Sequence, residues 1–170
     1  MAGDGLPFDL RVETHEGLNA LVRAIRAEGD GKELRRDLAR NMRDAMRPAT
    51  ADAKSAIMGM SSAGPGTSPA LRSAIAKKIR PEVKLGGRWT GARIKAFKTK
   101  NIRGFVNAPK RTNRPRGWRH LVYGREDSWV TQHGKAKWFD HAMDGIETNA
   151  RDAVHQAMED MARRLASRIG

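Results

Sequence analysis

Hydrophobic residues near the start of the chain follow a two-residue period. Residues 8–14 alternate Phe8, Leu10 and Val12 with polar or charged neighbours. Side chains of a strand point alternately to opposite faces, so this spacing is typical of a strand that buries one face. We expect a short strand here with a charged outer face.

From residue 16 the apolar spacing changes to three or four residues, which is typical of amphipathic helices. A first helix is expected from Glu16 to the turn Gly29-Asp30-Gly31, and a second from Asp30, which we expect to act as its N-cap. Pro48 should bend or interrupt the second helix, leaving Ile57 as the main anchor of its continuation. The two apolar stripes are Leu18, Leu21, Val22 and Ile25, then Leu34, Leu38, Met42 and Met46.

Two further helices are expected. Residues 61–68 have the composition of a loop, after which Ser68 and Pro69 should start a short helix that Pro81 stops. Its apolar face would be Leu71, Ile75 and Ile79. The clearest element is a long amphipathic helix over 143–169. Its stripe is Met143, Ile146, Ala150, Val154, Ala157, Met161, Leu165 and Ile169.

Between residues 81 and 124 short apolar runs predict a small antiparallel sheet. They lie at Val83 and Leu85, Ile94 and Ala96, Phe105 and Val106, and Leu121 to Tyr123. Residues 107–117 have no apolar period, two Pro and four basic residues, so we expect an extended, mobile loop. The predicted class is α+β: a small antiparallel sheet packed by N-terminal helices and a long C-terminal amphipathic helix. We expect a single domain, 1–170, with the basic loop of about 99–118 as an interaction arm.

Positive charge is concentrated in one segment. Between Lys77 and Arg119, fifteen Lys or Arg side chains stand against one acid, Glu82, so this segment carries the whole formal net charge of +14. Three interpretations stay open: a solvated face, a nucleic-acid surface, or a docking arm for an acidic protein partner. The expected interface residues are Lys110, Arg111, Arg114, Arg116, Trp118 and Arg119.

The sequence carries no recognisable catalytic or metal-binding pattern. The chain has no cysteine, its five His lack the spacing of a zinc hydrolase, and its one glycine-rich loop, at Gly64, lacks a phosphate-binding lysine. We expect no cofactor, no metal and no enzymatic activity. The alternative is a hydrolase whose site forms only in three dimensions, with Ser128 or His133 as its candidates. No apolar run is long enough to cross a bilayer and the N-terminus lacks the order of a signal peptide, so no membrane association is expected.

The residues from Gly117 onward carry a motif. It reads Gly-Trp-Arg-His-Leu-Val-Tyr-Gly-Arg-Glu-Asp-Ser-Trp-Val-Thr-Gln, then Lys-Trp-Phe-Asp-His-Ala, then the long helix. This resembles the tail-completion or head–tail joining family of siphophages, especially the versions carried by actinobacterial phages. The positions that match are His120, Val122, Tyr123, Gly124, Trp129, Val130, Gln132, Trp138 and Phe139. Upstream, residues 66–75 keep Leu71, Ser73 and Ile75 of a second family stretch but depart at its acidic and second threonine positions.

The resemblance implies architecture rather than chemistry. Gly124 would form a tight turn, Trp129 and Trp138 would cover the open end of a small sheet, and the long helix would pack across it. The protein would be a non-enzymatic subunit of a ring, expected to be a hexamer, in the virion neck, and would lie in the host cytoplasm during assembly. Expected partners are copies of itself, the connector or stopper, the tail terminator or tail tube, and genomic DNA in the channel without sequence preference.

Two alternatives stay open at this point. One is a basic protein that binds nucleic acid without sequence preference. The other is a tail terminator or head–tail stopper in the same neck, because these are also small α+β proteins.

Overall fold

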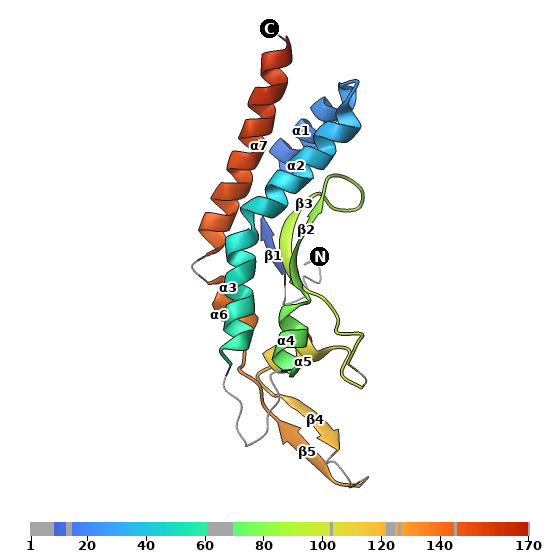
Figure 1. The fold of residues 1–170 in the computed structure, drawn as a ribbon, viewed down its shortest axis with the longest axis vertical. Coiled ribbons are helices and arrows are strands. Elements are labelled where there is room, and N and C mark those ends of the chain that lie inside the picture. Colours follow the sequence, from blue (N-terminus) through green and yellow to red (C-terminus); the bar gives the residue numbers. More distant parts are fainter. Residues whose placement is uncertain are drawn as a thin grey trace. The chain divides into compact units, whose positions relative to one another are not determined.

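The computed structural model describes residues 9–12, 15–60, 70–102, 104–121, 125, 127–144 and 146–169. It confirms an α+β fold, drawn in Figure 1. Contacts divide the chain into two compact units. Unit 1 takes its described residues from Asp52–Arg80 and Ala96–Asp144, and unit 2 takes them from Asp9–Ala51, Pro81–Lys95 and Gly145–Gly170. The expectation of a single domain stays a prediction.

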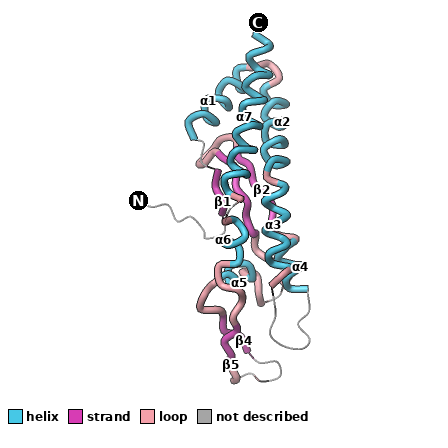
Figure 2. Tube along the Cα trace, turned by 90° about the vertical axis from the view of Figure 1, so that its left-hand side faces the viewer, coloured by secondary structure: helices cyan, strands magenta, loops and turns pink. Residues whose placement is uncertain are grey.

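Three helices build most of unit 2. They are α1 (His15–Ala27), α2 (Gly31–Ala45) and α7 (Glu147–Ile169), and each packs against the other two, as Figure 2 also shows. The predicted apolar stripes of α1 and α2 are buried, and Leu34, Leu38, Met42 and Met46 have no exposed surface. On α7 the buried positions Val154, Met161 and Leu165 follow the same spacing. Burial of these stripes against one another stabilises the helices far more than their intrinsic propensity does.

A three-stranded sheet completes this architecture. Its strands are β1 (Asp9–Val12), β2 (Ile79–Lys84) and β3 (Gly91–Ala96), in the order β1-β3-β2. β1 pairs antiparallel with β3, with Asp9 opposite Lys95 and Val12 opposite Ala92. α7 packs on β1, so the expected packing of the long helix on a small sheet is confirmed.

The predicted helix ending at Pro81 is shorter than expected. α4 spans Ala70–Ala76, Lys77 and Lys78 form a turn, and Ile79 begins β2. Placing Ile79 on the helix face was therefore wrong, although its side chain is fully buried. Pro81 lies inside β2 and does not stop a helix. An edge strand tolerates proline because part of its backbone needs no N–H donor for the sheet.

At Pro48 the chain forms two joined helices. α2 ends at Ala45, Met46 follows as its C-cap, and α3 spans Arg47–Met58. Pro48 therefore occupies the first turn of α3, where its missing N–H costs no hydrogen bond. The Thr50 hydroxyl donates to the Met46 carbonyl at 2.8 Å, a hydrogen bond that stabilises the junction of α2 and α3.

Unit 1 contains a second, separate sheet, so the expectation of one sheet was wrong. β4 (Trp118–Leu121) and β5 (Trp129–Gln132) form an antiparallel ribbon with Trp118 opposite Gln132 and Leu121 opposite Trp129. Two short helices, α5 (Ala108–Asn113) and α6 (Trp138–Met143), pack on each other. Phe105 and Val106 lie in turns outside any strand, because their backbone closes a loop onto the buried Thr99.

The expectation of an extended conformation over 107–117 was also wrong, because a helix forms there. Pro109 lies in the first turn of α5, and the Thr112 hydroxyl donates to the carbonyls of Ala108 and Pro109 at 2.9 and 3.1 Å. The Trp138 indole N–H donates to the Thr112 hydroxyl at 3.1 Å. These polar side chains are buried and satisfied, which holds the segment in place.

Asn113 extends this set of hydrogen bonds. We call the set made by the Thr112, Asn113 and Trp138 side chains and their bonding partners the Thr112–Asn113 network. The Asn113 side-chain oxygen accepts from the Phe139 N–H at 2.9 Å, and its amide donates to Asp140 at 3.1 Å. The Asn113 carbonyl accepts from the Lys137 N–H at 2.8 Å. The Asn113 side chain therefore stabilises the first turn of α6, although Asn113 is distant from α6 in the sequence.

The long helix also begins later than predicted. Met143 ends α6, and Asp144 has an extended backbone that separates α6 from α7. Several sequence predictions lie outside the described residues. These are the loop 61–68, the start signal Ser68 and Pro69, and the motif positions Val122, Tyr123 and Gly124.

Candidate functional site

A basic cleft of about 450 Å³ lies in unit 1, lined by α5, the turn that follows it and the β4–β5 ribbon. We call it the Arg–Trp cleft. Its lining is Arg111, Arg114, Arg116, Gly117, Trp118, Arg119 and Thr131. Five of the six predicted interface residues are thus brought together. Lys110, the sixth, is exposed on α5 and does not line the cleft.

Aromatic rings contact two of the four arginines of this cleft. The Trp118 and Phe105 ring centroids are 5.3 Å apart, and the Arg111 guanidinium lies 5.3 Å from the Phe105 centroid. The Arg119 guanidinium lies 5.5 Å from the Trp129 ring. A cation over a ring face is attracted by the ring quadrupole, which positions these two arginines. Among the described residues no ion pair to Arg111 or Arg119 is found.

Gly117 makes the entry into β4 feasible. Its φ of +66° is left-handed, and a Cβ there would stand 2.1 Å from the Gln132 carbonyl oxygen. Only glycine fits, because the clash is with the backbone of the neighbouring strand. The cleft and the ribbon therefore depend on the same residue.

The motif residues divide into a buried group and an exposed group. Trp138 and Phe139 are buried at the start of α6 and pack edge to face, with centroids 5.6 Å apart. His120 is half-buried on β4, whereas Trp129, Val130 and Gln132 are exposed on β5. The expectation that Trp129 covers the end of a sheet was wrong, because more than half of its surface, 53%, is exposed.

The β4–β5 ribbon exposes apolar side chains on both faces. Leu121 is 42% exposed and lies opposite Trp129, while Val130 is 41% exposed and points to the other face. An isolated two-stranded ribbon is at best marginally stable in water. Exposed apolar surface on such a ribbon indicates an interaction site.

A second basic cleft, of about 720 Å³, lies in unit 2 and was missed by sequence analysis. We call it the α2 groove. Its cationic lining is Arg26, Lys32, Arg35, Arg36, Arg40 and Arg43. A count of net charge hides these residues, because acids of the same region offset them numerically. A helical projection of α2 would have revealed the stripe.

No set of three or more His, Asp or Glu side chains that could hold a metal occurs within the described part of the chain. Ser128 is half-buried before β5 and His133 is exposed after it. Of the described helices, none is long and apolar enough to cross a membrane.

Comparison with known proteins found no protein family, no curated protein and no solved structure that matches this chain.

Proposed function

We propose that this protein is a non-enzymatic structural subunit of a siphophage neck, a tail-completion protein that joins the head connector to the tail tube within a homo-oligomeric ring. Its place would be the virion, with host cytoplasm as its site of assembly. The motif from Gly117 to Phe139 supports the family, and the exposed apolar ribbon carries the proposal of assembly. Tail terminator and head–tail stopper are alternative roles in the same neck.

The ribbon suits contact between ring subunits. Leu121, Trp129 and Val130 are large apolar side chains that the described part of unit 1 leaves exposed. Tryptophan is enriched at the centres of protein interfaces, where its burial contributes much of the binding energy. Ring interfaces are head-to-tail, so one surface of each subunit meets a different surface of the next.

The test is the effect of a charge on the ribbon. Leu121→Asp should abolish or weaken by at least tenfold the association of the protein with itself and with neighbouring neck proteins, measured by light scattering and co-purification. Met58→Asp is the matched control, because Met58 on α3 has the same exposed fraction of 42%. Association that survives Leu121→Asp, or that both changes abolish equally, would contradict the proposal.

A second candidate function is nucleic-acid binding without sequence preference, and the Arg–Trp cleft is the observation that favours it. Four arginines and an aromatic ring in one cleft suit phosphate contact and base stacking. The test is duplex affinity of the double variant Arg116→Gln/Arg119→Gln against salt concentration. Unchanged affinity and salt dependence would remove this candidate.

A further inference from the structure

The α2 groove presents a continuous basic stripe. Positions 32, 35, 36, 39, 40 and 43 recur at three or four residues and share one face of α2, and all but Ala39 are Lys or Arg. Arg26, in the last turn of α1, adds a sixth cation. Of the described lining residues only Glu28 is acidic. The groove is therefore strongly positive along its length.

Two of these cations are crowded against one point of the loop after β2. The Arg35 Nη2 donates to the Leu85 carbonyl at 2.7 Å, which fixes that side chain. A Cβ at Gly86 would stand 2.8 Å from Arg26 Nη2 and 3.9 Å from Arg35 Nη2. Both guanidinium groups therefore lie near the same backbone position, and like charges brought together repel each other unless an anion offsets them. Arg35 Nε is buried and has no hydrogen-bond partner in the part of the chain that is described.

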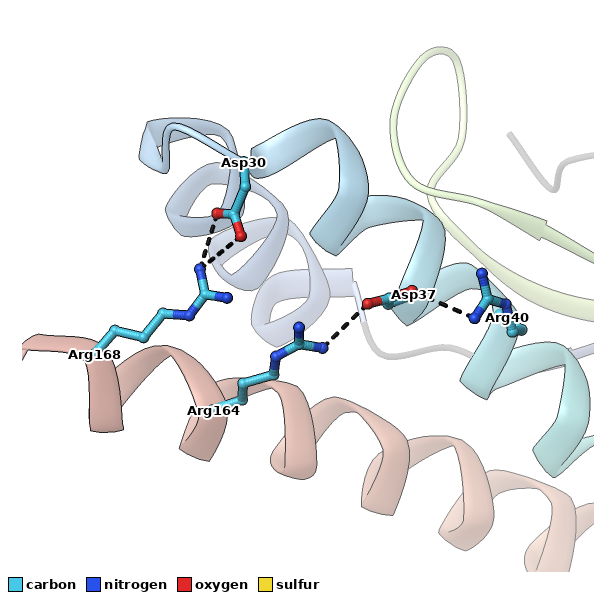
Figure 3. A network of polar contacts seen from close by, with 5 residues as sticks. All are labelled: Asp30, Asp37, Arg40, Arg164 and Arg168. Carbon is cyan, nitrogen blue, oxygen red and sulfur yellow. Dashed lines mark hydrogen bonds and ion pairs between the residues drawn. The ribbon is translucent and has the colours of Figure 1, made fainter.

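Two acids of this region, Asp30 and Asp37, are engaged by arginines of α7, as Figure 3 shows. Asp30 accepts from Arg168 of α7 at 2.8 Å, and Asp37 accepts from Arg164 at 3.1 Å. Of the groove cations, Arg40 lies 3.5 Å from Asp37 but keeps 65% of its side chain exposed. No ion pair to Lys32, Arg36 or Arg43 is found among described residues. Folding thus separates acids that face α7 from cations that face the groove.

We propose that the α2 groove binds the phosphate backbone of nucleic acid without reading its sequence. Eleven helical steps separate Lys32 from Arg43, a span of about 16 Å at 1.5 Å per residue. Phosphates of one duplex strand rise about 3.4 Å each, so the stripe matches a run of about five rather than a single phosphate. Arginine forks suit phosphate oxygens, and the groove is rich in arginine.

The groove does not suit base stacking or an acidic protein as well. No aromatic side chain occurs among the described residues that line it. Protein interfaces have an apolar core, whereas the apolar residues here are Ala39, Val83 and the buried Leu85. Nucleic-acid interfaces are more polar and more positive than protein interfaces. This inference does not depend on the ring assembly proposed above.

The experiment measures binding of the full chain to a 20-base-pair DNA duplex at several salt concentrations. The groove variant is Arg36→Gln/Arg43→Gln, and both side chains are exposed. We expect the slope of log affinity against log salt to lose about 1.8 units in magnitude, because each phosphate contact contributes about 0.9. The control, Lys54→Gln/Lys77→Gln, removes two charges from exposed positions outside both clefts and should lose less than half as much.

Three results would overturn the inference. They are a groove variant with the wild-type slope, a control that loses as much as the groove variant, and displacement of the duplex by poly-glutamate at equal charge concentration. The last result would assign the groove to acidic protein. Circular dichroism of each variant verifies that α2 is intact, and light scattering separates loss of duplex binding from loss of assembly.

Discussion

The two basic clefts of this protein are built in opposite ways. The Arg–Trp cleft takes its cations from a short helix, a turn and a ribbon, and aromatic rings hold two of its arginines. The α2 groove takes most of its cations from one face of a single helix, with no ring among its described lining residues. The first cleft combines charge with stacking surface and apolar contact. The second offers charge alone, which favours phosphate over protein.

Net charge along the sequence locates the Arg–Trp cleft but not the α2 groove. The segment from Lys77 to Arg119 has one acid, Glu82, and Arg93 pairs with it at 2.5 Å. Its excess is therefore visible in the sequence. Around α2 the charges nearly balance by number, and only the pairing of Asp30 and Asp37 with α7 sorts them by face.

The largest effect should come from removing Trp138, the buried ring that is hydrogen-bonded to α5, the helix that carries Arg111 of the Arg–Trp cleft. Trp138→Ala should lower the free energy of unfolding by about 3–5 kcal/mol, because it empties a fully buried site. Hydrogen exchange should show lost protection in α5 while α2 keeps its protection. Trp129→Ala is the control of the same residue type. Since Trp129 is exposed, its change should stay within about 0.5 kcal/mol.

A smaller effect should follow from the loss of a single hydrogen bond in the Thr112–Asn113 network. Thr112→Val keeps the shape but leaves the buried Trp138 indole N–H without its acceptor, which should cost about 1–3 kcal/mol. Denaturant unfolding followed by tryptophan fluorescence measures the change. Thr131→Val, on the exposed strand β5, should be close to neutral. If both valine variants lowered the free energy of unfolding equally, the Thr112–Asn113 network would not stabilise α5.

The smallest effect concerns the acids that face α7. The hydrogen bond from Arg168 lowers the pKa of Asp30 below its usual value of 3.8. Because the folded pKa is lowered, the pair stabilises the fold above about pH 3.8, and this contribution is lost as the pH falls through the lowered pKa. Asp30→Asn should therefore lower the thermal midpoint slightly near pH 6, and the difference should shrink as the pH falls through the lowered pKa. A difference that persists in strong acid would contradict the ion pair.

Sequence patterns predicted the elements whose apolar residues repeat regularly. The stripes of α1, α2 and α7 and the strands β2 and β3 follow from local spacing, although α7 starts at Glu147 because Asp144 separates it from α6. Residues 107–117 have no such spacing, and their helix depends on Trp138 and Phe139, which are distant in sequence. Long-range polar contacts of this kind leave no periodic signal. For the same reason Asp30, expected as the N-cap of α2, makes no side-chain cap bond and accepts from Arg168 instead.

The candidate site was predictable in composition but not in shape. The cluster of Arg111, Arg114, Arg116 and Arg119 beside Trp118 is visible in the sequence, and the structure gathers these residues around one cleft. The exposure of Trp129 was not predictable, because an aromatic residue in a strand is usually half-buried.

The most direct test of the central claim is the mass of the purified protein by light scattering at low and high salt, with and without duplex DNA and neighbouring neck proteins. The account predicts a salt-resistant assembly several times the monomer mass of 18.8 kDa, which forms alone or on those partners and does not require DNA. A monomer of 18.8 kDa under every condition, or one whose mass changes only with DNA at low salt, would contradict it.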